Sequence, residues 1–224
     1  METKTDLLEK GAILQRDKET YAIAPHIPGG IIFDPNVLRK FADVAEKFGA
    51  KALKLTSAQR IAIVGIPEEK IDDVWEAIGM DKGHAVGLCV RSVKICPATA
   101  FCKRAQQDGV TLGLELDKLY HGMELPSKFK IGVSGCSNSC AESIVKDLGL
   151  VGMPKGYKVY IGGNAGGRPR LANLLTEQVA QEDVLPLVEK IVAYYKSNAK
   201  KFERVGAMIE RLGWDKVQKD ILAV

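Results

Sequence analysis

The chain has 224 residues, of which 46% are hydrophobic and 27% charged, and this composition is typical of one large or two small globular domains. Its 32 basic and 28 acidic residues leave a net charge of +4, a mild value that gives no reason to expect nucleic acid as a partner. No apolar run approaches the ~20 residues that span a bilayer, and no secretory signal is expected at the start, so we expect no membrane partner.

The first eighty residues predict a small sheet with helices on one face. After an extended arm or frayed helix over residues 1–20, short strands are expected at 21–24, 52–55 and 60–64. One helix is expected to begin at Asp34 and Pro35, as N-cap and first helical residue, and to stop at Gly49. A second is expected between Pro67 and Gly79. This alternation of strands and helices favours an α+β sandwich.

The rest of the chain mixes helices and strands and ends in helices. Helices are expected at 98–107, 110–123 and, two or three of them, at 181–224, and strands at 127–133 and 158–161. Side chains alternate along a strand, so Lys128 and Lys130 are expected to share one face while Phe129 points to the other. Such a lysine pair is also common on solvated edge strands, where it discourages aggregation.

A glycine-rich segment, Gly162–Gly167, follows the strand expected at 158–161. A glycine-rich loop between strand and helix can bind a dinucleotide when its glycines follow the G-x-G-x-x-G spacing. These glycines do not follow that spacing, and no acidic residue at the end of a following strand is evident. The segment therefore predicts neither NAD nor flavin binding.

Four of the five cysteines form two close pairs, Cys96 with Cys102 and Cys136 with Cys140. Two such pairs can bring four thiolates to one iron–sulfur cluster. Zinc is the second choice, since zinc ribbons usually separate paired cysteines by about 2 to 4 residues. A disulfide framework is not expected in a chain that can bury a sizeable core unaided. Cys89 stands alone and is expected to be a buried structural cysteine.

These residues resemble a known family, the sulfite and nitrite reductases that hold a siroheme coupled to a [4Fe–4S] cluster. The family signature is Cys-x5-Cys, then Gly-Cys-x3-Cys-x6-Asp/Glu-hydrophobic-Gly-hydrophobic. It is matched by Cys96, Cys102, Gly135, Cys136, Cys140, Asp147, Leu148, Gly149 and Leu150. The resemblance implies that Cys96, Cys102, Cys136 and Cys140 are the cluster ligands. It also implies that the Cys140 thiolate bridges a cluster iron and the siroheme iron.

The resemblance implies an anion site as well. Arg91 stands in an Arg-x-Val motif, and Lys128 and Lys130 stand in Leu-Pro-x-Lys-Phe-Lys, as residues that hold the substrate beside the siroheme do in the family. Arg60 corresponds to the nitrite-reductase branch, whereas larger assimilatory enzymes have this arginine at the position of Ala58. Arg91, Lys128, Lys130 and Arg60 are therefore the expected catalytic residues.

The glycine-rich segment lines the siroheme in the family. By this resemblance Asn164, Arg168 and Arg170 are expected to bind siroheme carboxylates, together with Arg91 and with Cys140 at the iron. The implied fold is α+β, with a ferredoxin-like half-domain at 1–80, a siroheme and [4Fe–4S] domain at 81–180, and C-terminal helices at 181–224.

The implied function is six-electron reduction of sulfite to sulfide, or of nitrite to ammonia. With no flavin or NAD site, a separate one-electron donor such as ferredoxin is required, and free thiolates suit a reducing cytoplasm. Large family members contain two copies of this module and this chain contains one, so either a homodimer supplies the missing half or the siroheme is more exposed. The alternative function is an electron-transfer or siroheme-carrier protein without turnover, for which the four cysteines suffice.

Overall fold

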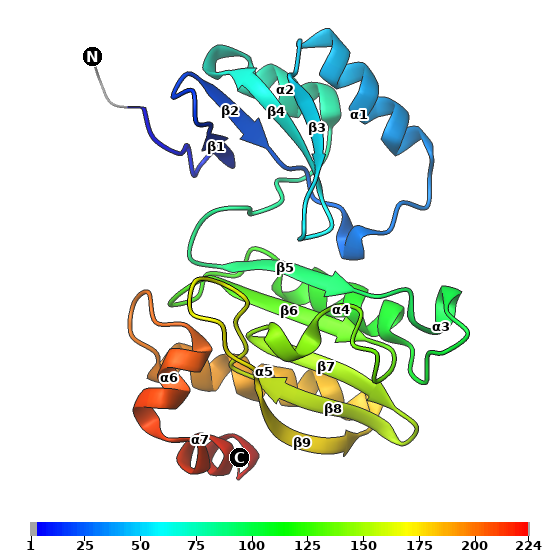
Figure 1. Ribbon diagram of the computed structural model, residues 1–224, viewed down its shortest axis with the longest axis vertical. Coiled ribbons are helices and arrows are strands. Elements are labelled where there is room, and N and C mark those ends of the chain that lie inside the picture. Colours follow the sequence, from blue (N-terminus) through cyan, green and yellow to red (C-terminus); the bar gives the residue numbers. More distant parts are fainter. Residues whose placement is uncertain (1–3, 224) are drawn as a thin grey trace. The chain divides into compact units, whose positions relative to one another are not determined.

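The computed structural model describes residues 4–223 and divides the chain into two compact units, Met1–Gly87 and Leu88–Val224 (Figure 1). We call them unit 1 and unit 2 and describe each by itself. Within residues 4–223, no helix has the length and apolar character needed to cross a membrane.

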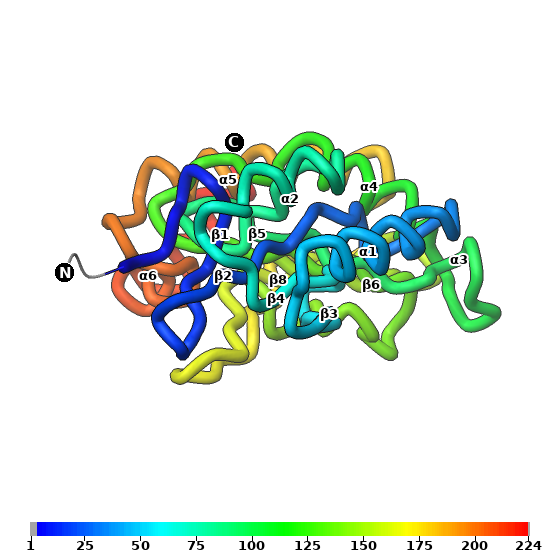
Figure 2. Tube along the Cα trace, turned by 90° about the horizontal axis from the view of Figure 1, so that it is seen from above, coloured from blue at the N-terminus to red at the C-terminus, as the bar shows by residue number. Residues whose placement is uncertain are grey.

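Unit 1 is a four-stranded antiparallel sheet covered by two helices. Its strands, in the spatial order β1-β2-β4-β3, are β1 (Ala12–Leu14), β2 (Thr20–Ile23), β4 (Ile61–Pro67) and β3 (Ala52–Leu55). The helices are α1 (Asn36–Lys47) and α2 (Ile71–Ile78), and short 3-10 turns lie at Pro28–Gly30 and Glu68–Lys70. Figure 2 shows both helices on the same side of this sheet.

The core of unit 1 explains this arrangement. Phe41 of α1, Val74 of α2 and Ile63 of the inner strand β4 are buried in one hydrophobic cluster. The 3.6-residue spacing of the apolar residues gives each helix one such face. Gly79 ends α2 in the left-handed conformation, with φ of 55°, which glycine adopts at little cost.

Two expectations for unit 1 need correction. The first residues are neither an extended arm nor a frayed helix throughout, because β1 pairs with β2, with Ala12 opposite Ile23. The second helix does not begin at Pro67, which is the last residue of β4. A 3-10 turn over Glu68–Lys70 comes before α2.

Unit 2 is built on a mixed five-stranded sheet in the spatial order β5-β6-β7-β8-β9. The strands are β5 (Val90–Ile95), β6 (Phe129–Ser134), β7 (Leu148–Met153), β8 (Gly156–Ile161) and β9 (Asn173–Val179). Strands β5, β6 and β7 are parallel, β8 pairs antiparallel with β7, and β9 pairs antiparallel with β8. The helices are α3 (Ala98–Phe101), α4 (Gly109–Tyr120), α5 (Gln181–Asn198), α6 (Val205–Leu212) and α7 (Trp214–Leu222).

The two faces of this sheet differ in character. On one face Phe129 of β6 packs against Tyr195 of α5, with ring centroids 5.6 Å apart. On the other face the sheet meets η3, the 3-10 turn Ser143–Val145. Gly149 of β7 lies against Ser143, and a Cβ there would meet the Ser143 carbonyl oxygen. The glycines of the signature thus allow the segment between β6 and β7 to lie directly on the sheet.

The helix expected at 98–107 is wrong beyond its first turn. Helix α3 ends at Phe101, and Cys102 is extended, with φ of −120° and ψ of 119°. The chain turns away because the N–H groups of Gln106 and Gln107 donate to the carbonyl oxygen of Gly135, at 2.7 and 3.1 Å. Cys102 therefore lies in a loop and not on a helix.

Candidate functional site

The four paired cysteines lie in two loops that leave neighbouring parallel strands at the same edge of the unit 2 sheet. Cys96 follows β5 directly, and its N–H donates to the Val133 carbonyl oxygen of β6 at 3.1 Å. Cys136 follows Gly135 just beyond β6. The Gly135 N–H donates to the Cys96 sulfur at 3.1 Å, so the first residue of one cysteine loop contacts a cysteine of the other.

Gly135 lies close to the first cysteine loop. A Cβ placed on it would lie 2.9 Å from Cα and Cβ of Ala98 and 3.0 Å from the Gln107 carbonyl oxygen. Real side chains do not tolerate such distances without movement of the backbone. The glycine that precedes Cys136 in the signature is therefore required for the two cysteine pairs to meet.

The chemistry of this set fits an iron–sulfur cluster. All five cysteines are free thiols. Among residues 4–223, no three His, Cys, Asp or Glu side chains lie close enough together to hold a single metal ion. A [4Fe–4S] cluster takes one thiolate on each of its irons, so its ligands surround a larger body than one ion does. Four thiols on two contacting loops, with a backbone N–H directed at one sulfur, fit the cluster better than zinc.

Of the two expected lysines, Lys130 lies in β6, the strand that leads to Cys136, and Lys128 lies directly before this strand. Phe129 is fully buried, while Lys128 is exposed and Lys130 half-buried, as the expected alternation requires. Burial lowers the pKa of Lys130, and the nearby charges of Lys146 and Arg204 lower it further, against the opposing effect of Asp147. Lys130 is therefore an ammonium group that the protein makes easier to deprotonate.

The two expected arginines lie in different units. In unit 2, Arg91 is half-buried on β5, at a register shift between Val90, which pairs with Phe129, and Ser92, which pairs with Lys130. Arg91 is therefore the sequence neighbour of Ser92, the residue that pairs with Lys130. In unit 1, Arg60 is 5% exposed, and its side chain lies against Gly83, where a Cβ would be 2.9 Å from Arg60 Cδ.

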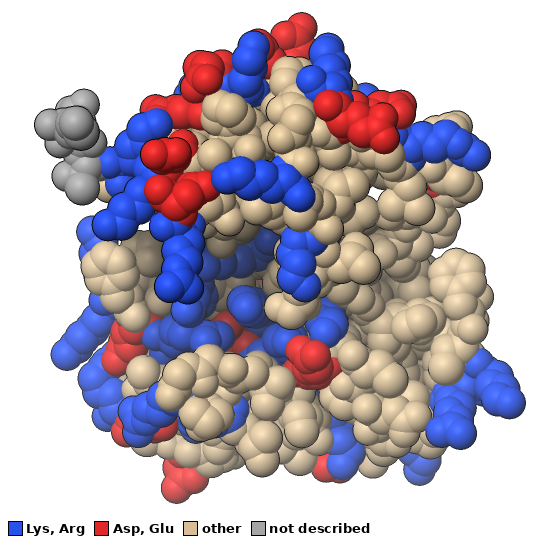
Figure 3. All heavy atoms as spheres, turned by 45° about the horizontal axis from the view of Figure 1, so that its top comes forward, with Lys and Arg blue, Asp and Glu red and all other residues tan. Residues whose placement is uncertain are grey.

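Glu142, two residues after Cys140, forms ion pairs with two lysines. Glu142 pairs with Lys94 of β5 at 3.0 Å and with Lys146 at 2.8 Å. These contacts lower the pKa of Glu142 to about 2, although Glu142 itself is exposed. On the face drawn in Figure 3, lysine and arginine side chains lie among aspartate and glutamate side chains. On the face of the unit 2 sheet that meets η3, Lys94 and Lys146 together carry one more charge than the Glu142 carboxylate that they share.

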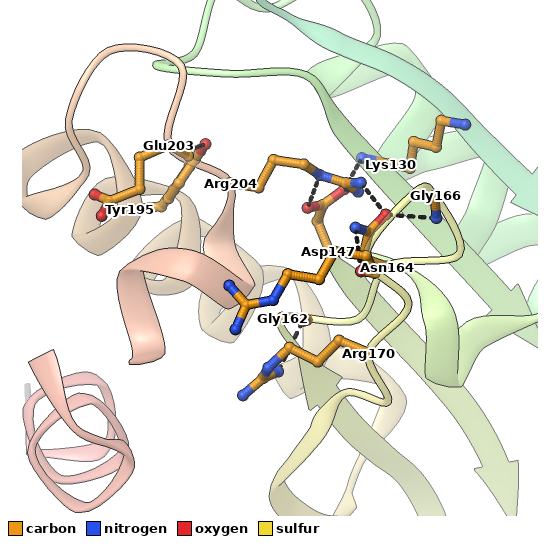
Figure 4. A network of polar contacts seen from close by, with 10 residues as sticks. Lys130, Asp147, Gly162, Asn164, Gly166, Arg170, Tyr195, Glu203 and Arg204 are labelled. Carbon is orange, nitrogen blue, oxygen red and sulfur yellow. Dashed lines mark hydrogen bonds and ion pairs between the residues drawn. The ribbon is translucent and has the colours of Figure 1, made fainter. Parts of the chain in front are cut away.

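A buried ion pair connects this face to the C-terminal helices (Figure 4). Asp147 is completely buried and accepts hydrogen bonds from Arg204 Nε at 3.1 Å and Nη2 at 2.6 Å. It also accepts the backbone N–H of Lys130 at 2.9 Å. Burial raises the pKa of the Asp147 carboxyl, and the Arg204 guanidinium opposes that shift.

The glycine-rich segment forms a closed loop. The backbones of Asn164 and Arg170 exchange two hydrogen bonds, both of 2.8 Å. The Asn164 side chain accepts the Gly166 N–H at 2.9 Å, donates to the Arg168 carbonyl oxygen at 2.9 Å, and accepts a short hydrogen bond from Arg204 Nη1. Asn164 therefore organises the loop, and its amide oxygen is already engaged by the protein.

The two arginines of this loop share one carboxylate. Glu210 of α6 lies 3.1 Å from Arg168 Nη1 and 3.5 Å from Arg170 Nε. A hollow of about 350 Å³ lies between the loop and α6. It is lined by Gly163, Asn164, Arg168, Pro169, Arg170, Phe202, Arg204, Gly206, Ala207 and Glu210. Arg168, Arg170 and Arg204 thus line one hollow together with the Glu210 carboxylate, and Arg170 also donates to the Gly162 carbonyl oxygen at 2.8 Å. The siroheme contacts expected of Arg168 and Arg170 stay a prediction.

Reasoning from sequence missed Arg204, Lys146, Lys94 and Glu142. Lys146 and Asp147 are adjacent, so the signature residue Asp147 gave a local signal for one of them. Lys94 shows the strand alternation that marked Lys128 and Lys130. Arg204 gave no local signal, because its partner Asp147 is 57 residues away in the sequence.

Comparison with family models matches nearly the whole chain. Residues 86–223 match the nitrite and sulphite reductase 4Fe–4S domain, and residues 13–80 match the nitrite/sulfite reductase ferredoxin-like half domain. The chain is 40% identical over 213 residues to an assimilatory-type sulfite reductase of Nitratidesulfovibrio vulgaris, covering 95% of this chain and 97% of that protein. It is 39% identical to an NAD(P)H nitrite reductase of Bacillus subtilis, covering 92% of this chain but only 26% of that protein.

Solved structures share the fold. The crystal structure of dissimilatory sulfite reductase I aligns with a TM-score of 0.81 at 15% identity, over 90% of this chain and 69% of that one. The NirA protein of Mycobacterium tuberculosis aligns with a TM-score of 0.75 at 18% identity, over 89% of this chain and 40% of that one. At these identities the likeness concerns the fold alone.

Proposed function

Because the chain belongs to the nitrite and sulphite reductase family, we propose that it reduces sulfite to sulfide, or nitrite to ammonia, at a siroheme coupled to a [4Fe–4S] cluster. One observation carries the proposal. The two signature cysteine loops contact each other at Gly135, at the end of the strand that also bears Lys130. The nearly end-to-end likeness to an assimilatory-type sulfite reductase favours sulfite as the substrate.

Cys96, Cys102, Cys136 and Cys140 would hold the cluster, and Cys140 would also face the siroheme iron. When bound, the two groups would pass on electrons from the donor and supply the iron at which the anion is reduced. Cys140 is the exposed one of the four and Cys96 the buried one. This gradient suits a ligand set in which Cys96 anchors the cluster within the protein while Cys140 meets a second group.

Lys128, Lys130 and Arg91 would hold the anion. Fixed cations in a partly buried site stabilise negative charge better than mobile water does, since they need no reorganisation as charge develops. Lys130 would also release a proton, because its pKa is lowered by burial and by Lys146 and Arg204. Arg60 keeps its predicted catalytic role by its resemblance to the nitrite-reductase branch.

Arg168, Arg170 and Asn164 would hold the siroheme. Both arginines line the hollow between the glycine-rich loop and α6, and bidentate guanidinium contacts suit carboxylates. Asn164 would act mainly through the loop that it organises, with its remaining amide hydrogen available to a ligand.

Electrons would come from a separate one-electron donor such as ferredoxin, since the glycine-rich loop lacks the dinucleotide pattern. Free thiolate ligands suit the cytoplasm. A homodimer would supply the second module that larger family members contain within one chain.

The visible spectrum of the purified protein, followed by turnover with an artificial one-electron donor, tests the proposal. Siroheme bands and consumption of sulfite or nitrite are expected. A protein that holds an iron–sulfur cluster but no siroheme would refute the reductase function and leave an electron-transfer protein.

A further inference from the structure

Arg204 joins two segments of unit 2 through a single side chain. Its Nε and Nη2 bind both oxygens of the buried Asp147, and its Nη1 binds the Asn164 amide oxygen (Figure 4). One planar guanidinium thus joins the residue before β7 to the glycine-rich loop. A lysine has one compact ammonium group and cannot reproduce this fork.

One partner of Arg204 reaches the proposed anion site, and the other reaches the loop proposed to hold the siroheme. Asp147 accepts the backbone N–H of Lys130, which fixes the strand position of that lysine. Asn164 holds the loop that carries Arg168 and Arg170 through the Gly166 N–H and the Arg168 carbonyl oxygen. The Lys130 strand and the arginine loop are therefore linked through a single side chain.

The backbone of Arg204 is itself held in place. The hydroxyl of the buried Tyr195 donates to the carbonyl oxygen of Glu203 at 2.6 Å, directly before Arg204. The Tyr195 ring packs against Phe129, the neighbour of Lys130 in β6. The contacts form a closed circuit from Phe129 through Tyr195 and Arg204 to Asp147 and back to Lys130.

We propose that Arg204 is a positioning residue that holds the Lys130 strand and the Gly162–Arg170 loop at a fixed separation, so that both bind one anionic cofactor and its substrate. This inference rests on the proposed reductase function. A purely structural ion pair would stabilise the fold without affecting the apparent affinity for the anion. A positioning residue affects that affinity even when the fold is intact.

The variant that best separates positioning from charge is Arg204→Lys. It keeps a cation beside the buried Asp147, and so avoids the strong destabilisation of an unpaired buried charge, but it loses the contact with Asn164. The matched control is Arg211→Lys. Arg211 also contacts a carboxylate at two points, with Nε and Nη2 each 2.7 Å from the Glu203 side chain, and its Nη2 donates to the Asn198 carbonyl oxygen at 2.8 Å. It therefore resembles Arg204 without the link to Asn164.

Hydrogen exchange gives a readout independent of turnover. In Arg204→Lys we expect faster amide exchange in residues 162–170 than in the wild type and in Arg211→Lys. We also expect KM for sulfite to rise on the order of tenfold, as for loss of one hydrogen bond to a charged group, with a smaller change in kcat. The siroheme bands should shift or lose intensity relative to the control.

Two results would overturn the role of Arg204. One is wild-type exchange in residues 162–170 of Arg204→Lys. The other is faster exchange there with KM and siroheme bands like those of the wild type. If Arg204→Lys does not fold, the double variant Arg204→Met/Asp147→Asn removes both charges, and the same outcomes apply. A wild-type protein without siroheme bands would instead refute the proposed function itself.

Discussion

Replacing Lys130 with methionine distinguishes the effect of this lysine on the free energy of unfolding from its effect on the rate of the reaction. The Lys130 ammonium is half-buried and lies near Lys146 and Arg204, which lower its pKa. A lysine whose folded pKa lies below its unfolded pKa destabilises the protein at neutral pH, and this cost disappears as pH rises through the folded value. Methionine keeps the aliphatic stem without the charge. We expect the free energy of unfolding to stay within about 0.5 kcal/mol of the wild type or to increase.

The rate of turnover, in contrast, should fall strongly in Lys130→Met. Loss of one fixed charge that stabilises an oxyanion costs ~10² to 10³ in rate, about 2.7 to 4 kcal/mol. Lys128 is exposed, where solvent screens its charge, so Lys128→Met should lose about fivefold or less. The assay is kcat/KM for sulfite and for nitrite with an artificial one-electron donor, beside urea unfolding curves. Lys158→Met on β8, where the lysine pairs with Glu177 at 2.8 Å, is the control. If Lys130→Met matched this control with both anions, Lys130 would have no part in the anion site.

Further predictions concern the cluster loops and the pH profile. Gly135→Ala should destabilise the fold by about 1 to 3 kcal/mol and reduce the iron and sulfide content of the protein, because the new Cβ would lie 2.9 Å from Ala98. A variant with the iron and sulfide content of the wild type would contradict this prediction. Cys140→Ser should uncouple the cluster and siroheme signals in electron paramagnetic resonance, whereas Cys89→Ser should retain them, and the reverse pattern would disprove the ligand assignment. The alkaline limb of kcat should lie below the ordinary lysine pKa of about 10.4 and should move to higher pH in Lys130→Arg; an unchanged limb would assign it to another group.

Local patterns in the sequence were enough for several parts of this structure. The alternation of Lys128, Phe129 and Lys130 predicted which side chains the strand buries, because side-chain direction in a strand follows from position alone. Helical spacing predicted the helices after residue 180, and three are present. The cofactor residues were assigned by resemblance to a family, and their individual roles stay predictions.

What the sequence did not reveal depends on contacts between distant segments. Cys102 was predicted on a helix, but the Gly135 carbonyl draws the following residues into a turn, and no pattern within 98–107 reports that contact. The pairing of Arg204 with Asp147 joins residues that are 57 positions apart in the sequence. Such pairings follow from tertiary packing, which overrides local propensity.

Glu210 has a consequence for how an anionic ligand would enter the hollow beside the glycine-rich loop. Its carboxylate already lies 3.1 Å from Arg168 Nη1 and 3.5 Å from Arg170 Nε. A ligand carboxylate that bound these guanidinium groups would replace the negative charge of Glu210 with its own. The exposed Glu210 side chain would then rotate into the solvent. Binding would then be an exchange of counterions within the protein, so its affinity would depend less on salt than binding to two bare arginines would.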